Sequence, residues 1–271
     1  MHGRRPLPLL LLATLLTAAC VQEGSGPLQV RENVFSWTGA VTPGSTVHVR
    51  DFAGTVEVRP AVDDTVRVSA RLEWRRGNPD KELSFTGMRV GADVLVCAVW
   101  GRGKCSVEDY DASLKLGREG TDAKLHLTVE VPAGVKVDAT NINGDIVVAA
   151  SAPVQAKTLN GSVRVATAVG PVQAETLNGA VDIRMSSLVG TDSVIAKTLN
   201  GAAYIYLPSV DDAVIDLGVA NGRASSAFPL DSATSGKTVR RTIGAGTRVI
   251  HAYSMNGEVA LRRLDAEGRS Q

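Results

Sequence analysis

Apolar and polar residues alternate along much of this chain. After three closely similar Asn-Gly pairs, apolar side chains recur at every second position, at residues 163 and 165, 181 and 183, and 203 and 205. A period of two is typical of a half-buried β-strand. No segment after the first twenty residues has the apolar period of an amphipathic helix, and several prolines fall between apolar runs, where they bound strands. The pattern predicts an all-β protein.

The alternating segments belong to an internal repeat. Residues 157–165, 175–183 and 197–205 share the pattern Lys/Glu-Thr-Leu-Asn-Gly followed by a short apolar strand. Weaker copies lie at 141–148, 220–224 and 254–261, and residues 52–58 resemble a degenerate first copy. Repeats of this length indicate stacked structural units. Successive Asn-Gly pairs are 17, 18, 22, 21 and 35 residues apart, and the last interval has room for one extra coil.

Charge decides between two arrangements of the repeat. Asn-Gly between strands often forms a tight hairpin, but a hairpin here would place Lys157 opposite Arg164 and Glu175 opposite Asp182, which are like charges. In a stack of parallel coils, Lys157, Glu175 and Lys197 become neighbours of alternating sign, and Arg164 lies beside Asp182. The repeat therefore predicts a β-solenoid, a stack of short parallel strands.

Each Asn-Gly pair is a corner in this arrangement. Glycine permits the positive φ of a sharp bend, and asparagine amides can hydrogen-bond from coil to coil. A structural ladder is the main interpretation; a column of asparagines that binds a ligand such as a glycan is the alternative. We expect Leu159, Leu177 and Leu199 to point inward. The corner residues are Asn143, Gly144, Asn160, Gly161, Asn178, Gly179, Asn200, Gly201, Asn221, Gly222, Asn256 and Gly257.

The region before the repeats is less regular but also strand-like. Alternation predicts strands at 46–50, 55–59, 65–74, 94–99 and 123–131, and the polar, glycine-bearing segment 101–122 is predicted to be a loop excursion. No Pro/Ser-rich linker separates this region from the repeats. We therefore expect one domain over residues 30–264, followed by a C-terminal tail over 265–271.

The first twenty residues predict export and lipidation. Arg4 and Arg5 precede a short leucine-rich stretch that is too short to span a membrane but typical of a signal peptide. It ends in Thr-Ala-Ala-Cys, which resembles the lipobox of bacterial lipoproteins. Residues 1–19 are then the signal peptide, Cys20 carries the lipid anchor, and residues 20–29 are a flexible tether. Val21, in place of an aspartate, favours the outer membrane.

Composition limits the classes of partner. Removal of residues 1–19 takes away Arg4 and Arg5 and leaves 27 basic against 28 acidic residues. With a net charge this close to zero, there is no electrostatic case for nucleic-acid binding.

Hydrophobic residues make up 44% of the chain and aromatic residues only 4%. A core of small aliphatic side chains suits a narrow solenoid.

Two cysteines remain after Cys20. Cys97 and Cys105 flank a glycine-bearing turn, and in an exported protein this spacing predicts a disulfide across a hairpin loop. A metal or redox pair is the alternative, but the spacing matches neither Cys-x-x-Cys chemistry nor a zinc site.

Candidate catalytic residues are sparse. His48, His126 and His251 lie in separate predicted strands and have no metal-ligand spacing, so we predict no metal and no cofactor. Some β-helices cleave polysaccharides, and Glu175 and Asp182 flank one corner. Their predicted neighbours in the stack are basic and keep both carboxylates ionised, whereas a general acid needs a raised pKa. We therefore predict that the protein is not an enzyme.

The repeats resemble a known family. The Thr-x-Asn-Gly-x-Val/Ile-x-Val copies, the Val-Glu-Val-Pro-Ala-Gly segment at 129–134 and the closing Ser-Met-Asn-Gly-Glu-Val are similar to the putative-adhesin β-strand repeat family of bacterial envelope proteins. The resemblance covers residues 30–264. It implies a solenoid-like fold, membrane anchoring and no established activity.

These observations give a leading hypothesis and two alternatives. The leading hypothesis is a membrane-anchored envelope module without enzymatic activity, which binds a glycan, an envelope protein or another copy of itself. One alternative is a carbohydrate-active β-helix enzyme. The other is a periplasmic accessory of envelope-stress signalling.

Overall fold

The computed structural model describes residues 26–111, 121–150, 152–189, 192–228 and 235–264. The predicted signal peptide, Cys20 and the tail 265–271 lie outside these residues. Within them, the one short 3-10 turn is η1 (Pro79–Lys81), and no helix is long and apolar enough to span a membrane. The strands are β1 (Gln29–Ala40), β2 (Thr46–Arg50), β3 (Gly54–Pro60), β4 (Thr65–Trp74), β5 (Leu83–Val90), β6 (Asp93–Trp100), β7 (Lys104–Cys105), β8 (Tyr110–Asp111), β9 (Lys124–Val131), β10 (Lys136–Asn143), β11 (Ile146–Ala150), β12 (Val154–Asn160), β13 (Val163–Thr167), β14 (Val172–Asn178), β15 (Val181–Met185), β16 (Ser193–Asn200), β17 (Ala203–Leu207), β18 (Ala213–Ser226), β19 (Ser235–Gly236), β20 (Thr238–Ile243) and β21 (Val249–Arg263).

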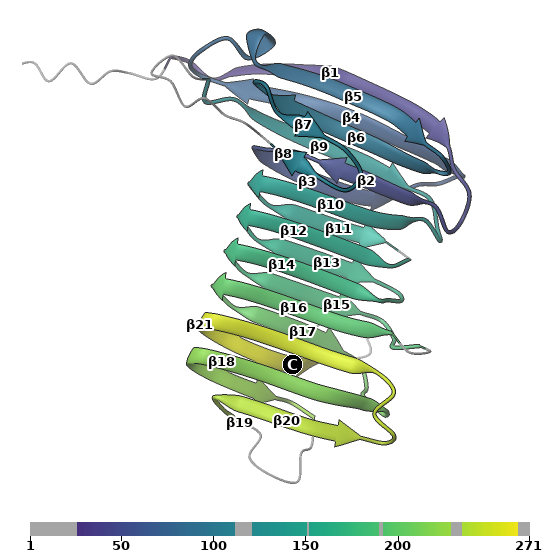
Figure 1. Ribbon diagram of the computed structural model, residues 1–271, viewed down its shortest axis with the longest axis vertical. Helices are drawn as coiled ribbons and strands as arrows, with labels where there is room; N and C mark the ends of the chain where they lie inside the picture. The colour runs from purple at the N-terminus through teal and green to yellow at the C-terminus, as the bar shows by residue number, and fades with distance from the viewer. Residues whose placement is uncertain (1–25, 112–120, 151, 190–191, 229–234, 265–271) are drawn as a thin grey trace, which may run out of the picture.

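The strands form two facing layers that meet at the Asn-Gly corners (Figure 1). Layer A contains the strands before each corner, in the order β5–β6–β2–β10–β12–β14–β16–β21–β18–β20. Layer B contains those after it, β1–β4–β9–β3–β11–β13–β15–β17–β21–β18–β19. Strands β18 and β21 continue through their corners and belong to both layers. The pairing is parallel throughout the middle and antiparallel only at the two ends, which confirms the predicted all-β solenoid.

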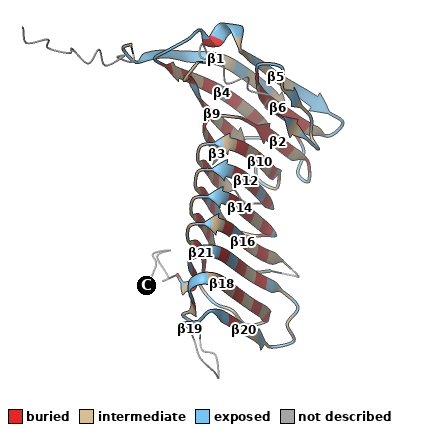
Figure 2. Cartoon of the chain, turned by 60° about the vertical axis from the view of Figure 1, so that its left-hand side comes forward, coloured by how far each residue is buried: buried red, intermediate tan, exposed pale blue. Residues whose placement is uncertain are grey.

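Small aliphatic side chains fill the space between the layers. Buried residues alternate with more exposed ones along the strands in the middle of the stack (Figure 2). The inward columns are made almost entirely of Val, Ala, Ile and Leu, and they form one continuous core from the first strands to the last coil. Burial of this apolar surface is the main favourable term in folding. Because each coil contributes the same small residues, neighbouring coils stack without large cavities.

The corners form the predicted ladder of asparagine amides. In each step the Nδ2 of one asparagine donates to the Oδ1 of its neighbour at 2.8 Å. Backbone amides continue the same pattern, since Gly161 N donates to Asn178 O at 2.9 Å. The spatial order of the ladder is Asn143, Asn160, Asn178, Asn200, Asn256 and Asn221.

Close approach of the coils explains why glycine follows each asparagine. Gly161 has φ of +155°, and a Cβ there would lie 2.2 Å from the carbonyl oxygen of Gly144 in the preceding coil. A side chain of any size would push adjacent coils apart. Glycine is thus required at the corner for steric reasons as well as for its backbone conformation.

The threonines of the repeat, and not the leucines, face the interior. Thr158, Thr176 and Thr198 are buried, and each hydroxyl donates to the corner glycine carbonyl of the preceding coil at 2.8–2.9 Å. The prediction that the leucines point inward is wrong: Leu159 and Leu177 are 41% and 37% exposed, and Leu199 is only half-buried. Strand alternation places the threonine in phase with the buried alanine two residues earlier, so the leucine must point outward.

The charged columns keep the predicted register, with one change of partner. Lys157, Glu175 and Lys197 are neighbours in layer A, and Lys157 Nζ lies 3.5 Å from Glu175 Oε2. Arg164 stacks on Asp182 in layer B as predicted. Its ion pair, however, is with Asp145 of the preceding coil, while Asp182 pairs with Arg184 two residues along its own strand.

The last repeat does not follow the chain order. We expected an extra coil in the 35-residue interval before Asn256. Instead, β20 returns antiparallel along the outer edge of β18, and β21 then inserts between β18 and the pair β16 and β17. The copy around Asn256 therefore precedes the copy around Asn221 in space. The interval contains the reversing strand, not another coil.

The irregular N-terminal part closes the other end of the stack. The predicted strands at 46–50, 55–59, 65–74, 94–99 and 123–131 correspond to β2, β3, β4, β6 and β9. Strands β1 and β5 were not predicted, and β1 starts at Gln29, the last residue of the predicted tether. They form the outer edges of layers B and A, where the rings of Phe35 and Phe85 stack at 5.2 Å. These aromatic residues cover the end of the aliphatic core.

Candidate ligand-binding groove

The outer surface of layer A is hollowed near the N-terminal ends of its strands. A groove of about 450 Å³ crosses five neighbouring strands, β2, β10, β12, β14 and β16. Its lining includes two prolines and two glutamines from successive copies of the repeat, so the groove follows the stack axis and not a single strand. The residues that line it are Thr46, His48, Lys136, Val137, Asp138, Pro153, Val154, Gln155, Pro171, Val172, Gln173, Ser193 and Ile195.

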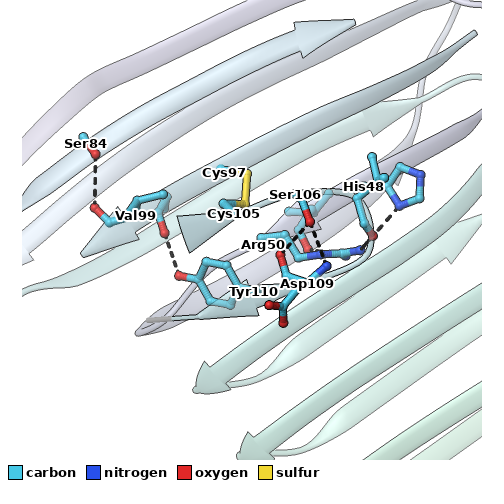
Figure 3. The surroundings of a disulfide bond; sticks show 12 residues. His48, Arg50, Ser84, Cys97, Val99, Cys105, Ser106, Asp109 and Tyr110 are labelled. Atoms are coloured by element: carbon cyan, nitrogen blue, oxygen red, sulfur yellow. Dashed lines mark hydrogen bonds between the residues drawn. A yellow bond between two sulfur atoms is a disulfide. The ribbon is translucent and has the colours of Figure 1, made fainter. Parts of the chain in front are cut away.

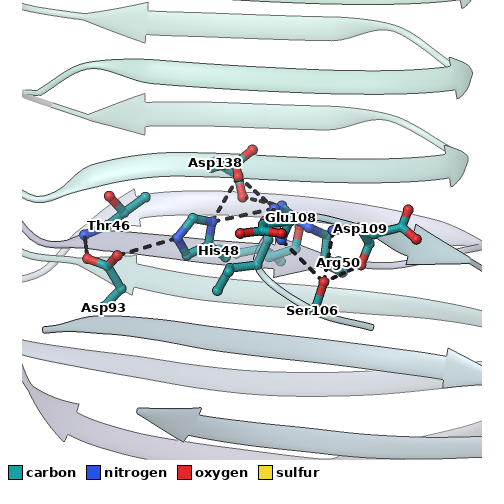
Figure 4. A network of polar contacts seen from close by, with 10 residues as sticks. Thr46, His48, Arg50, Asp93, Ser106, Glu108, Asp109 and Asp138 are labelled. Carbon is teal, nitrogen blue, oxygen red and sulfur yellow. Dashed lines mark hydrogen bonds and ion pairs between the residues drawn. The ribbon is translucent and has the colours of Figure 1, made fainter. Parts of the chain in front are cut away.

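A network of charged side chains forms one end of the groove (Figure 4). His48 and Arg50 point outward from β2 because they alternate with Val47 and Val49, which face the core. The Nδ1 of His48 lies 2.8 Å from Oδ2 of Asp138 on β10, and Arg50 Nη2 donates to the same oxygen at 2.6 Å. The network thus joins residues almost ninety positions apart in the chain.

A second carboxylate lies on the other side of the histidine. Asp93, at the start of β6, accepts the backbone N–H of Thr46 at 2.7 Å, and its Oδ2 lies 3.7 Å from His48 Nε2. The imidazole therefore sits between two carboxylates, one from each neighbouring strand. Both ring nitrogens have an acidic neighbour, which fixes the ring orientation.

The disulfide-bonded segment holds Arg50 in place (Figure 3). Cys97 on β6 is paired in register with Arg50 and is joined to Cys105, with the two Cα atoms 6.3 Å apart. The predicted disulfide is therefore formed. It positions the segment after β7 over the guanidinium, where Val107 O accepts from Arg50 Nη2 at 2.7 Å. Arg50 is almost fully buried as a result.

Tyrosine and serine contacts fix the rest of this segment. Tyr110 on β8 donates its hydroxyl to Ala98 O at 2.6 Å, and burial, with a smaller contribution from Asp51, raises the tyrosine pKa. The Ser106 hydroxyl accepts the backbone N–H of Asp109 at 2.9 Å. The predicted loop excursion 101–122 thus contains a small ordered cap over residues 101–111, and residues 112–120 lie outside the described part.

The electrostatics of Asp138 favour its ionised form. Burial would raise the pKa of this carboxyl, but the hydrogen bonds from His48 and Arg50, together with their charges, outweigh burial and hold the pKa below its usual value. Asp138 therefore remains a carboxylate near neutral pH. Its charge is balanced by Arg50, and Asp93 and Lys136 add one charge of each sign, so this end of the groove is polar but carries little net charge.

The network has the geometry of a structural element and contains no paired nucleophile. Among the described residues, no group of three or more His, Cys, Asp or Glu side chains has an arrangement suited to a metal ion. His48 lies outside every motif found in the sequence, and we expected it only as a strand surface or packing residue. Its contacts with Asp138 and Asp93 place this outward-facing strand residue at the end of the groove.

The structure separates the two carboxylates considered as a glycosidase pair. Glu175 lies on the outer surface of layer A, where Gln173 donates to it at 2.8 Å. Asp182 lies on the outer surface of layer B with Arg184 as its partner. The corner brings their strands together but directs the two side chains away from the core on different layers.

An aromatic cluster on layer B is packed against arginine side chains. Tyr204 and Tyr206 lie edge to face at 6.3 Å, the Arg262 guanidinium is 4.0 Å from the Tyr204 ring centre, and Arg184 is 4.4 Å from that of Tyr206. Cation–π contacts of this kind satisfy the rings internally.

The sequence carries a signal for the groove in the residues before each repeat. The repeat extends upstream as Pro153-Val-Gln-Ala and Pro171-Val-Gln-Ala, so the same four residue types occupy the same phase in adjacent copies. Alternation places the valine and alanine inward and the glutamine outward. Stacking of the copies then forms a row of prolines beside a row of glutamines.

Comparison with known proteins supports the fold. No protein-family model matches this chain, and no curated protein matches it in sequence. A putative cell adhesion protein from Clostridium sporogenes has a similar structure, with a TM-score of 0.50 and 10% identity over 86% of this chain and 100% of that one. The similarity to that structure extends over nearly the whole described chain and concerns the fold alone.

Two further structures are more distant. A putative adhesin from Bacteroides fragilis has a TM-score of 0.31 and 11% identity over 86% of this chain and 97% of that one. A putative adhesin from Parabacteroides distasonis has a TM-score of 0.23 and 10% identity over 88% and 98%.

Proposed function

We propose that this protein is a non-enzymatic binding module of the bacterial cell envelope, held to the membrane by a lipid on Cys20, and that the groove across layer A binds its ligand. The observation that carries the proposal is the groove itself, which crosses five stacked strands and is open along the stack axis. An elongated, open groove of this kind fits a stretch of an extended chain better than a compact small molecule.

The lining indicates the chemistry of the ligand. Gln155 and Gln173 present amide donors and acceptors from successive coils, and Pro153 and Pro171 add apolar surface beside them. The charges of Asp138 and Arg50 at the end of the groove compensate each other. These features favour an uncharged, polar chain with a regular repeat, such as a glycan of the envelope or of a neighbouring cell.

The rigid scaffold supports a role in adhesion. Solenoids present long surfaces because each coil is fixed by its neighbours, and the groove residues lie on strands whose backbones are paired on both sides. Little conformational entropy would be lost when such a surface binds. The fold is shared with a structure described as a putative cell adhesion protein.

Site-specific photo-crosslinking in intact cells tests the groove. A benzophenone side chain at Gln155 lies in the groove, and the same side chain at Arg164, four residues beyond the corner on the same coil, lies on layer B outside it. We expect Gln155 to crosslink to an envelope glycan or protein and Arg164 to give no such product. Equal products from both positions, or products from Arg164 alone, would contradict the assignment of the groove.

A further inference from the structure

The six Asn-Gly pairs share a chemical weakness. When asparagine precedes glycine, the glycine backbone nitrogen can attack the side-chain carbon Cγ, a C–N bond forms, and the amide leaves as ammonia. Water then opens the resulting cyclic imide to aspartate or isoaspartate. The reaction requires that the glycine N–H be free to lose its proton and that the backbone at this position be able to move.

The stack protects the glycine nitrogen at most corners. At four corners the glycine N–H donates to the asparagine carbonyl of the next coil, and this bond must open before the nitrogen can react. Gly257 lies in register with Gly222, which places the Asn221 carbonyl in the equivalent position. The bonds recorded for the other protected corners are Gly144 to Asn160 at 2.7 Å, and Gly161 to Asn178, Gly179 to Asn200 and Gly201 to Asn256 at 2.9 Å.

Asn221 is the last member of the ladder, and no further coil follows it within the described part of the chain. On the outer side of β18, the pairing with β20 reaches Gly218, Val219 N donates to Lys237 O at 2.9 Å, and pairing resumes with β19 at Ala224. Among the described residues, therefore, no strand lies opposite the N–H of Gly222. The side-chain amide of Asn221, the residue before Gly222, donates to Asn256. Among the described residues, no asparagine of a following coil donates to Asn221 in turn.

The Asn221–Gly222 pair also differs from the other five pairs in its exposure to solvent. Asn221, Gly222 and Arg223 are all exposed. At the other five corners the asparagine is also exposed, but the glycine is half-buried under the next coil. The end of the ladder thus differs from its interior in both hydrogen bonding and access to water.

We propose that Asn221–Gly222 is a site of spontaneous deamidation and that the other five Asn-Gly pairs are protected by the ladder. Isoaspartate at this position adds a methylene group to the backbone, which disrupts the register of Gly222 with Gly257. That contact has no spare room, because a Cβ at Gly222 would lie 1.7 Å from Gly257 O. The modification therefore loosens the terminal coil formed by β18 and β20.

Peptide mapping by mass spectrometry tests the proposal on the full chain. After incubation of the folded protein in mildly alkaline buffer, we expect aspartate and isoaspartate to accumulate at Asn221 more than about tenfold faster than at any other Asn-Gly pair, since opening of a paired corner is needed elsewhere. The same chain in urea, where every corner is free, should lose this selectivity. Similar rates at all six sites in the folded protein, or a faster rate at another site, would overturn the proposal.

A variant provides the matched control. Asn221→Gln retains a side-chain amide but forms the cyclic imide much less readily, because the larger ring is less favourable. Nearly all deamidation of the folded chain should disappear in this variant, while deamidation in urea should continue at the remaining five sites. Persistent deamidation of the folded variant at its usual rate would show that Asn221 is not the reactive position.

Discussion

In other coils, the position equivalent to Asp51 is occupied by a residue with a hydroxyl or an amide side chain. It lies in register with Asn141 and Thr158, whose side chains donate to glycine carbonyls at the corners. Asp51 is fully buried, and neither carboxyl oxygen has a hydrogen bond of good geometry. Burial raises its pKa to about 8, although the nearby N–H groups of Phe52, Trp100 and Ala53 act in the opposite direction.

This pKa predicts a loss of stability as the pH rises. In the unfolded chain Asp51 has its ordinary pKa near 3.8, so between about pH 4 and pH 8 the chain must take up a proton to fold. Its contribution to the free energy of unfolding should fall by up to about 1.4 kcal/mol per pH unit across this window. Asp51→Asn should remove this slope and stabilise the protein at neutral pH, as measured by urea unfolding at several pH values. An unchanged pH profile in the variant would contradict the buried-carboxyl explanation.

At the scale of the element, the corner sets how closely the coils pack. The asparagine amides, the threonine hydroxyls and the glycine backbone all bond across one interval between coils, so the three parts of Thr-x-Asn-Gly act together. Stability in such stacks depends on the interfaces between neighbours. A defect at one corner therefore affects the coils on both sides.

Gly161→Ala should be strongly destabilising. The new Cβ would meet the Gly144 carbonyl at less than contact distance and would impose a residue with a side chain on φ of +155°. We expect a loss of more than about 3 kcal/mol in the free energy of unfolding. Gly44→Ala is the control, because Gly44 also has positive φ but nothing lies near its Cβ position; it should cost only about 1–2 kcal/mol. Equal losses in urea unfolding would mean that coil contact is not the cause.

At the scale of the whole molecule, the two ends of the stack are closed in different ways. Aromatic residues on β1 and β5 cover the N-terminal end, whereas the reversing strand β20 borders the C-terminal end. Exposed ends of a sheet invite pairing with other chains. Arg240 and Thr242 on β20 place polar side chains along that edge. The proposed anchor at Cys20 precedes the N-terminal end, which would orient the stack away from the membrane.

The anchor is tested by Cys20→Ser. If Cys20 is acylated, the wild-type protein should be in the membrane fraction and take up labelled palmitate, since acyl chains add about 0.8 kcal/mol per buried methylene. The variant should lose the label and leave the membrane fraction. A variant that stays with the membrane would contradict lipid anchoring.

Protease treatment of intact cells then places the wild-type stack: digestion indicates the cell surface, and protection until permeabilisation indicates the periplasm.

The sequence by itself determined the strand class, the repeat and the parallel stacking. These follow from local or periodic signals: alternation, the spacing of Asn-Gly, and charges that repel in a hairpin but attract in a stack, as with Lys157 and Glu175. The approximate bounds of β2, β3, β4, β6 and β9 followed in the same way, whereas the short strands β7 and β8 fall in the segment predicted as a loop. Strands β1 and β5 were missed because they lie at sheet edges, where both faces are partly exposed and alternation is weak.

Only the tertiary structure decided the details that depend on distant partners. Leu159 points outward because the strand phase and the bond from Thr158 to a carbonyl of another coil outweigh its hydrophobicity. Strand β21 lies between β16 and β18, out of chain order, and pairs in parallel with both. His48 joins Asp138 because parallel stacking brings β2 beside β10. The insertion of β21 and the contact of His48 leave no periodic signal in the chain, since the residues concerned become neighbours only when the stack has formed.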